Sequence, residues 1–132
     1  MKELPCRQLP VHVVDGKRPQ KSIVISDKSA IDSGKSMVLH CNGGGKKRDE
    51  NRELAGCAAA WQGSHGCDEY PSAMAQEGGF RARAMGVPYI PEQRIQGLDL
   101  ARLVTTNKLK RGDLFMVLVI NVRKECGVYV AG

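Results

Sequence analysis

The sequence has few aromatic residues and no long hydrophobic run. Its 132 residues include two Phe, three Tyr and one Trp, so we expect a small and mainly aliphatic core. No stretch of about 18 consecutive apolar residues occurs, which excludes a helix of the kind that spans a bilayer. Residues 1–6 contain no hydrophobic signal-peptide core. Two alternatives therefore stay open: a cytosolic chain, or a mature or excised domain behind an added Met.

Several catalytic signatures are also missing. No Cys-x-x-Cys pair occurs, which argues against a zinc ribbon or a thioredoxin-type site. The segment 43–47 is rich in glycine and lysine, but it lacks the spacing and the Ser or Thr of a phosphate-binding loop. No Gly-x-Ser-x-Gly motif of a serine hydrolase occurs. Cys41 follows His40, but neighbours on a strand point to opposite faces, which disfavours a Cys–His nucleophile.

Cysteine itself is not scarce. Five cysteines are many for a reducing compartment and favour one or two disulfides. The preferred pair is Cys57 with Cys67, because both flank one expected loop. Cys6 with Cys126 would join the two ends and leave Cys41 over. Five reduced thiols are the alternative.

The chain is basic, with a formal net charge of +6. Its 20 Lys and Arg residues are spread along the whole sequence and form no long tail. This pattern suits a face that binds a polyanion such as nucleic acid. It is also common among soluble domains, so charge alone does not separate a nuclease from a binding module.

The hydrophobic pattern predicts a single α+β domain over residues 1–132. A small antiparallel sheet would have its helices packed on one side. Segments 11–15 and 22–26 predict a hairpin, and the apolar run 114–122 predicts a central strand. Further strands are expected at 36–41, 81–86 and 127–130. Helices are expected at 46–61, from 69 or 70 to 76 or 77, and at 97–107, with a loop at 87–93.

A possible site emerges from three segments in order. His40 ends a predicted strand, and Arg48, Asn51 and Arg52 follow on a predicted helix. Asp68-Glu69 then stands at another predicted helix start. Phosphodiester hydrolysis needs a base for water and a cation that neutralises the phosphate. Imidazole suits the first role, carboxylates the cation, and Arg side chains the phosphate.

The motifs in these segments resemble those of the NucA/NucB deoxyribonucleases, small bacterial DNases that are mostly secreted. The resemblance rests on Lys-Arg-Asp-Glu-Asn-Arg-Glu at 47–53, Cys-Asp-Glu-Tyr-Pro-Ser-Ala at 67–73 and Gln-Glu-Gly-Gly at 76–79. It covers roughly residues 36–122. It implies a ββα-metal-like core, similar to the His–metal-finger nucleases, in which a hairpin and a helix frame one divalent metal.

The resemblance also implies a role for each candidate residue. His40 would be the general base, where secreted Bacillus members have an Asp. Glu69 would bind the metal, and Asp68 would support it or orient a metal-bound water. Three further candidates would hold phosphate or orient the site (Arg48, Asn51, Arg52). Two others would contact the metal ligands without binding the metal themselves (Gln76, Glu77).

The expected function is that of a metal-dependent endonuclease that cuts DNA with little sequence preference, using one Mg²⁺ or Mn²⁺. We expect a secreted monomer, either a free nuclease or the toxic domain of a larger effector. A toxin would need a cognate inhibitor protein, and RNA stays open as a substrate. The alternative is a non-catalytic basic nucleic-acid-binding module in which Asp68-Glu69 only caps a helix.

Overall fold

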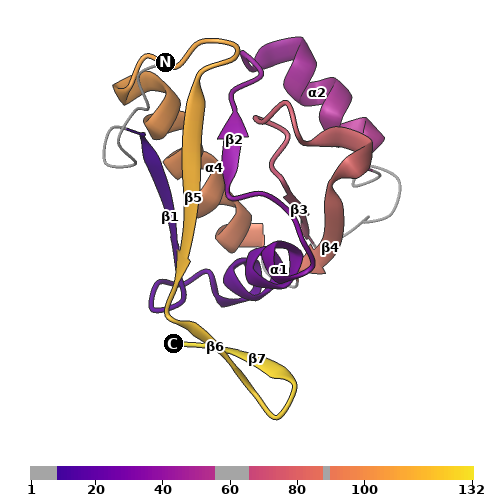
Figure 1. Cartoon of the computed structure of the whole chain (residues 1–132), viewed down its shortest axis with the longest axis vertical. Helices are drawn as coiled ribbons and strands as arrows, with labels where there is room; N and C mark the ends of the chain where they lie inside the picture. Colours follow the sequence, from indigo (N-terminus) through magenta and orange to yellow (C-terminus); the bar gives the residue numbers. More distant parts are fainter. Residues whose placement is uncertain (1–8, 56–65, 88–89) are drawn as a thin grey trace.

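A three-stranded sheet forms the centre of the computed structural model, which describes residues 9–55, 66–87 and 90–132. Its strand order is β1 (Val11–Asp15), β5 (Leu114–Ile120), β2 (Val38–His40) (Figure 1). β5 pairs in parallel with β1 and antiparallel with β2, so the central sheet is mixed and not wholly antiparallel as predicted. The predicted central place of the 114–122 segment is therefore confirmed.

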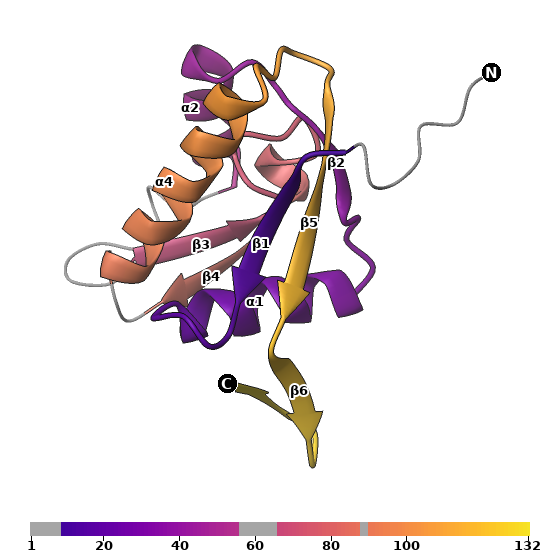
Figure 2. The same ribbon diagram turned by 90° about the vertical axis from the view of Figure 1, so that its left-hand side faces the viewer.

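Two long helices cover one face of this sheet. α1 (Lys21–Asp32) and α4 (Ile90–Thr106) lie on the same side, as Figure 2 shows. α1 buries Ile23, Val24 and Ala30 against that face, where Phe115 and Val117 of β5 are also buried. Among the described residues no helix covers the opposite face, so α1 and α4 pack on one side, as the sequence predicted.

The remaining elements lie around this core. β3 (Gly66–Tyr70) and β4 (Arg83–Val87) form an antiparallel pair, with a 3-10 turn η2 (Gly79–Arg81) before β4. α2 (Gly45–Leu54) follows β2. β6 (Val122–Glu125) and β7 (Val128–Ala131) form a hairpin that projects from one end of the molecule. None of the helices in the described part is long and apolar enough to cross a membrane.

Two predicted elements are wrong. Residues 22–26 belong to α1 and not to a hairpin strand, because Ile23, Val24 and Ala30 recur with helical spacing and are all buried. The helix expected from residue 69 or 70 is absent from the described 66–79 region. Its start is strand β3, in which Asp68 and Tyr70 are buried and pair across to β4.

Other predictions differ in extent. α4 begins at Ile90, so the helix expected at 97–107 is longer and the loop expected at 87–93 is shorter. α2 ends at Leu54, whose side chain is 58% exposed and does not form the expected apolar stripe. The other stripe members, residues 58 and 61, lie outside the described residues. The α+β class and the strands at 36–41, 81–86 and 127–130 are confirmed.

The described cysteines correct one disulfide. Cys126 is free and exposed in the β6–β7 turn, so the predicted bond to Cys6 is wrong. Cys41 is free and buried, as expected for the cysteine left over. The preferred Cys57–Cys67 pair has one member outside the described residues, so that pairing stays a prediction.

Candidate active site

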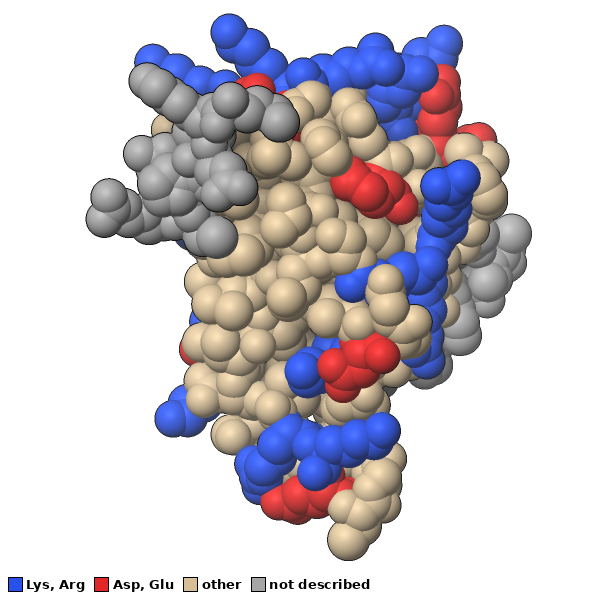
Figure 3. All heavy atoms as spheres, in the orientation of Figure 1, with Lys and Arg blue, Asp and Glu red and all other residues tan. Residues whose placement is uncertain are grey.

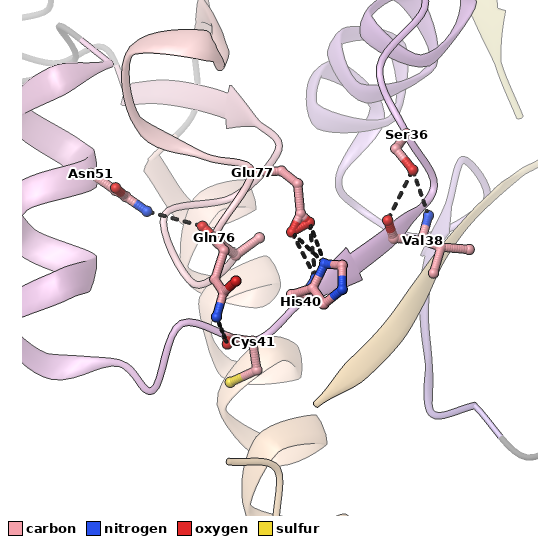
Figure 4. Close-up of polar contacts among 8 residues, drawn as sticks. Ser36, Val38, His40, Cys41, Asn51, Gln76 and Glu77 are labelled. Carbon is pink, nitrogen blue, oxygen red and sulfur yellow. Dashed lines mark hydrogen bonds and ion pairs between the residues drawn. The ribbon is translucent and has the colours of Figure 1, made fainter. Parts of the chain in front are cut away.

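His40 ends β2 and is held by one carboxylate. Both oxygens of Glu77 accept the His40 backbone N–H, at 2.8 and 2.9 Å. The same oxygens lie 3.2 and 3.3 Å from the ring Nδ1 (Figure 4). A proton on Nδ1 satisfies this contact and leaves Nε2 with its lone pair, the form that a general base needs. The His40 side chain is 51% exposed, so its ring is open to a substrate.

The loop that carries Glu77 is fastened to the end of β2. We call residues 71–78, between β3 and η2, the bridging loop. Gln76 N–H donates to the His40 carbonyl at 2.7 Å, and Gln76 Nε2 donates to the Cys41 carbonyl at 3.3 Å. Asn42 N–H donates to the Met74 carbonyl at 2.9 Å. Glu77 therefore reaches His40 because the loop pairs with the edge of β2.

Two asparagines hold the same loop from its other side. Asn51 of α2 donates its side-chain amide to the carbonyls of Ala75, at 2.9 Å, and Ala73, at 3.3 Å. The Asn42 side-chain amide also donates to the Ala73 carbonyl. Asn51 was predicted to hold phosphate or orient the site. Its amide hydrogens are directed at the loop, so here it positions the backbone that carries Glu77.

The glycine pair after Glu77 allows this close packing. A Cβ on Gly78 would lie 2.5 Å from the Ser72 carbonyl oxygen, a backbone atom that has no room to move. Gly79 has a φ of +85°, and a Cβ there would lie 2.9 Å from Asn51 Oδ1. Both positions require glycine, one for space and one for its backbone conformation.

The predicted phosphate ligands and Glu69 gather around α2 and the bridging loop. Glu69 accepts the Ala73 N–H, and its other oxygen, Oε2, is enclosed without a hydrogen-bond partner in the described structure. Burial raises the pKa of Glu69, opposed by the charge of Arg52 and the Ala73 N–H. Arg52 is exposed, and Arg48 is half-buried with Nε 3.5 Å from Asp49.

Asp68 faces a different environment from Glu69. It is buried between α1 and α4, where it contacts Ser26 and Asp27 and feels the charge of Glu92. Burial raises the pKa of Asp27 well above its usual range, and Asp68 beside it adds to the rise. Asp27 therefore keeps its proton and donates to Asp68. The structure does not bring Asp68 and Glu69 together on one site.

The carboxylates near His40 limit how a cation could bind. Within the described residues, no three His, Cys, Asp or Glu side chains converge as a metal site would require. A cation here would be coordinated by one or two protein oxygens and by water at its other positions, as is usual for Mg²⁺. Glu77 fits this role because a carboxylate has about four acceptor lone pairs, and the two N–H donors of His40 use two of them.

Comparison with known protein families decides between a nuclease and a binding module. The family described as Deoxyribonuclease NucA/NucB matches residues 27–118. The chain belongs to this family. Among curated proteins, none matches the chain significantly.

Membership of the NucA/NucB family makes the chain a deoxyribonuclease, a hydrolase whose substrate is DNA. The family match runs from α1 into β5 and includes His40, Glu77 and the glycine pair. It leaves out β1 and the β6–β7 hairpin. The site therefore lies within the family core.

Two features of the site were not predicted from the sequence. The first is Asn42, to which the sequence assigns no role, although an Asn in a glycine-rich turn typically forms side-chain hydrogen bonds to the nearby backbone. Its Oδ1 accepts the Gly44 N–H at 2.8 Å. The second is Glu77, which was expected to contact the metal ligands and not His40. Only the pairing of the bridging loop with β2 reveals that contact.

Proposed function

We propose that this NucA/NucB deoxyribonuclease is a metal-dependent endonuclease that cuts DNA with little sequence preference, with His40 as its general base. The observation that carries the proposal is the His40–Glu77 contact at an exposed strand end. Nε2 of His40 takes a proton from the attacking water. Nδ1 keeps its own proton and donates it in a hydrogen bond to Glu77. Arg48 and Arg52 lie on the next helix and are the candidates to bind the scissile phosphate.

A divalent cation, Mg²⁺ or Mn²⁺, would neutralise charge on the phosphate and the leaving oxygen. Glu77 would hold it, because this carboxylate borders His40 and is partly open to solvent. Glu69, the ligand predicted from the sequence, is the second candidate because Oε2 lacks a partner. That oxygen is enclosed, which favours Glu77 as the residue that meets both cation and substrate.

The proposal extends to the setting of the enzyme. A secreted nuclease and the toxic domain of a secreted effector both suit a family of DNases that is typically secreted. In the second case a cognate inhibitor protein would protect the producing cell.

A plasmid-nicking assay tests the mechanism. The wild type should nick DNA with Mg²⁺ or Mn²⁺ and stop with a chelator. His40→Ala should lower the rate by about 10²–10⁴-fold, the usual contribution of a general base. Normal cutting by a folded His40→Ala protein would show that another residue is the base.

Metal binding separates the two carboxylates. Mn²⁺ binding, followed by electron paramagnetic resonance, should be lost in Glu77→Gln and kept in Glu69→Gln. The matched substitutions remove one charge each and keep the side-chain shape. Loss of Mn²⁺ binding in Glu69→Gln alone would assign the cation to Glu69.

A further inference from the structure

A group of basic side chains lies just beyond the site, on a loop outside the predicted phosphate ligands. Lys108, Lys110 and Arg111 stand between α4 and β5, and Lys46 is the second residue of α2. We call these four residues the basic ridge. All four are exposed. Figure 3 shows Lys and Arg side chains along the upper edge of the molecule, over α2 and the loop before β5.

The basic ridge is fixed to the end of β2. Gly112 N–H donates to the Cys41 carbonyl at 2.8 Å, and Cys41 N–H donates to the Asp113 carbonyl at 2.8 Å. A Cβ built on Gly43 would lie 3.4 Å from Arg111 Cβ, so the two loops are in contact. The bonds on Cys41 anchor the loop one residue beyond His40.

The charge of the basic ridge is available to a ligand. Within the described structure, none of its four side chains forms an ion pair. Lys47 is different, because its Nζ lies 3.8 Å from Glu50. The nearest acid in the loop is Asp113, whose Oδ2 accepts the Lys110 N–H at 2.7 Å and so closes the turn.

We propose that the basic ridge binds the phosphate backbone of DNA and carries the duplex past His40. Four exposed cations, on the loop before β5 and in the first turn of α2, have no ion pair within the described residues and lie beside an exposed base, which suits a polyanion that runs over both segments. Such contacts position the duplex and read no sequence. This inference rests on the proposed function, because it adds the path by which the substrate of the same site is held.

Binding of a short fluorescent DNA duplex tests this path without cutting. The full chain with His40→Ala serves as the parent, and anisotropy is measured over a range of salt. Lys46→Gln with Lys110→Gln should weaken binding about ten-fold at low salt and reduce the slope of log Kd against log salt by about 2. The matched control is Lys17→Gln with Lys21→Gln, two exposed lysines near the other end of the sheet.

The control variant should bind almost as the parent does, although its net charge falls equally. In the active protein, the ridge variant should raise KM and leave kcat nearly unchanged. Equal weakening by both double variants would overturn the proposal, because net charge would then explain all binding. A wild type that cuts no DNA would contradict the proposed function. A loss of binding in the ridge variant alone would still support the basic ridge as the DNA-binding surface.

Discussion

Asp68 and Glu69 show how one peptide bond separates two chemical environments. On strand β3 their side chains point to opposite faces. Asp68 joins Asp27 and Glu92 inside the fold, whereas Glu69 lies near Arg52. Burial raises the pKa of Asp27 most, and the neighbouring Asp68 raises it further, which explains why Asp27 keeps a proton.

This placement predicts that Asp68 is dispensable for chemistry. Asp68→Asn should retain most cutting activity, because its side chain meets Asp27 and Ser26 and not His40. The melting temperature should stay the same or rise, since the substitution removes a buried charge. Nicking rates and thermal melts check both. A variant that melts normally and does not cut would restore Asp68 to the active site.

Among the elements, β1 contains a buried titratable group. His12 is 5% exposed, and its Nε2 has no hydrogen-bond partner in the described structure. Burial lowers the pKa of His12 from 6.5 to about 4, opposed by the charge of Asp99 and assisted by that of Arg18. The unfolded chain therefore takes up this proton first as the pH falls.

The free energy of unfolding should fall as the pH is lowered, because His12 is buried in its neutral form. The contribution of neutral His12 is complete above pH 6.5 and is lost as the pH falls toward 4. Between about pH 7.5 and about pH 5 the free energy of unfolding should drop by about 2 kcal/mol on this account. Urea titrations of the wild type and His12→Leu check this. The variant should lose less stability over that interval, and equal losses would contradict the assignment.

The elements also show where sequence patterns are sufficient. The run 114–122 is apolar enough to identify β5 as a central strand, and His40 was correctly placed at the end of β2. α1 was missed because Ile23, Val24 and Ile25 are β-branched and read as a strand over five residues. The helical spacing appears only when Ala30 is included, and buried Asp27 interrupts the apolar pattern.

The site was predicted in part for a related reason. The family motifs contain Glu69 and Glu77, and His40 ends the predicted strand before them, so the presence of all three was predictable. Their contacts were not, because they depend on pairing between β3 and β4 and between the bridging loop and β2. Acids before a Pro suggest a helix start when read locally. Long-range strand pairing overrides that signal.

At the scale of the molecule, the family core and its additions can be separated. The match ends at residue 118, and the β6–β7 hairpin projects beyond it. The hairpin packs on α1, where Tyr129 Oη donates to Asp32 at 2.8 Å. It lies at the end of β5 opposite to the basic ridge and His40, since β5 begins at Leu114 beside His40 and ends at Ile120.

Removal of the hairpin should therefore separate stability from activity. A chain that ends at Asn121 should melt at a lower temperature, because α1 loses the contacts of β7. It should still nick plasmid DNA at a temperature where it is folded. Circular dichroism and the nicking assay check the two properties. A folded truncated chain that does not cut would place part of the site on the hairpin.

The His40–Glu77 contact joins residues 37 positions apart in the chain. Under the proposed mechanism, a chain in which the bridging loop has not docked on β2 would hold His40 without Glu77 and would lack an oriented base. Cutting activity would then report the docking of this loop and not the presence of secondary structure alone.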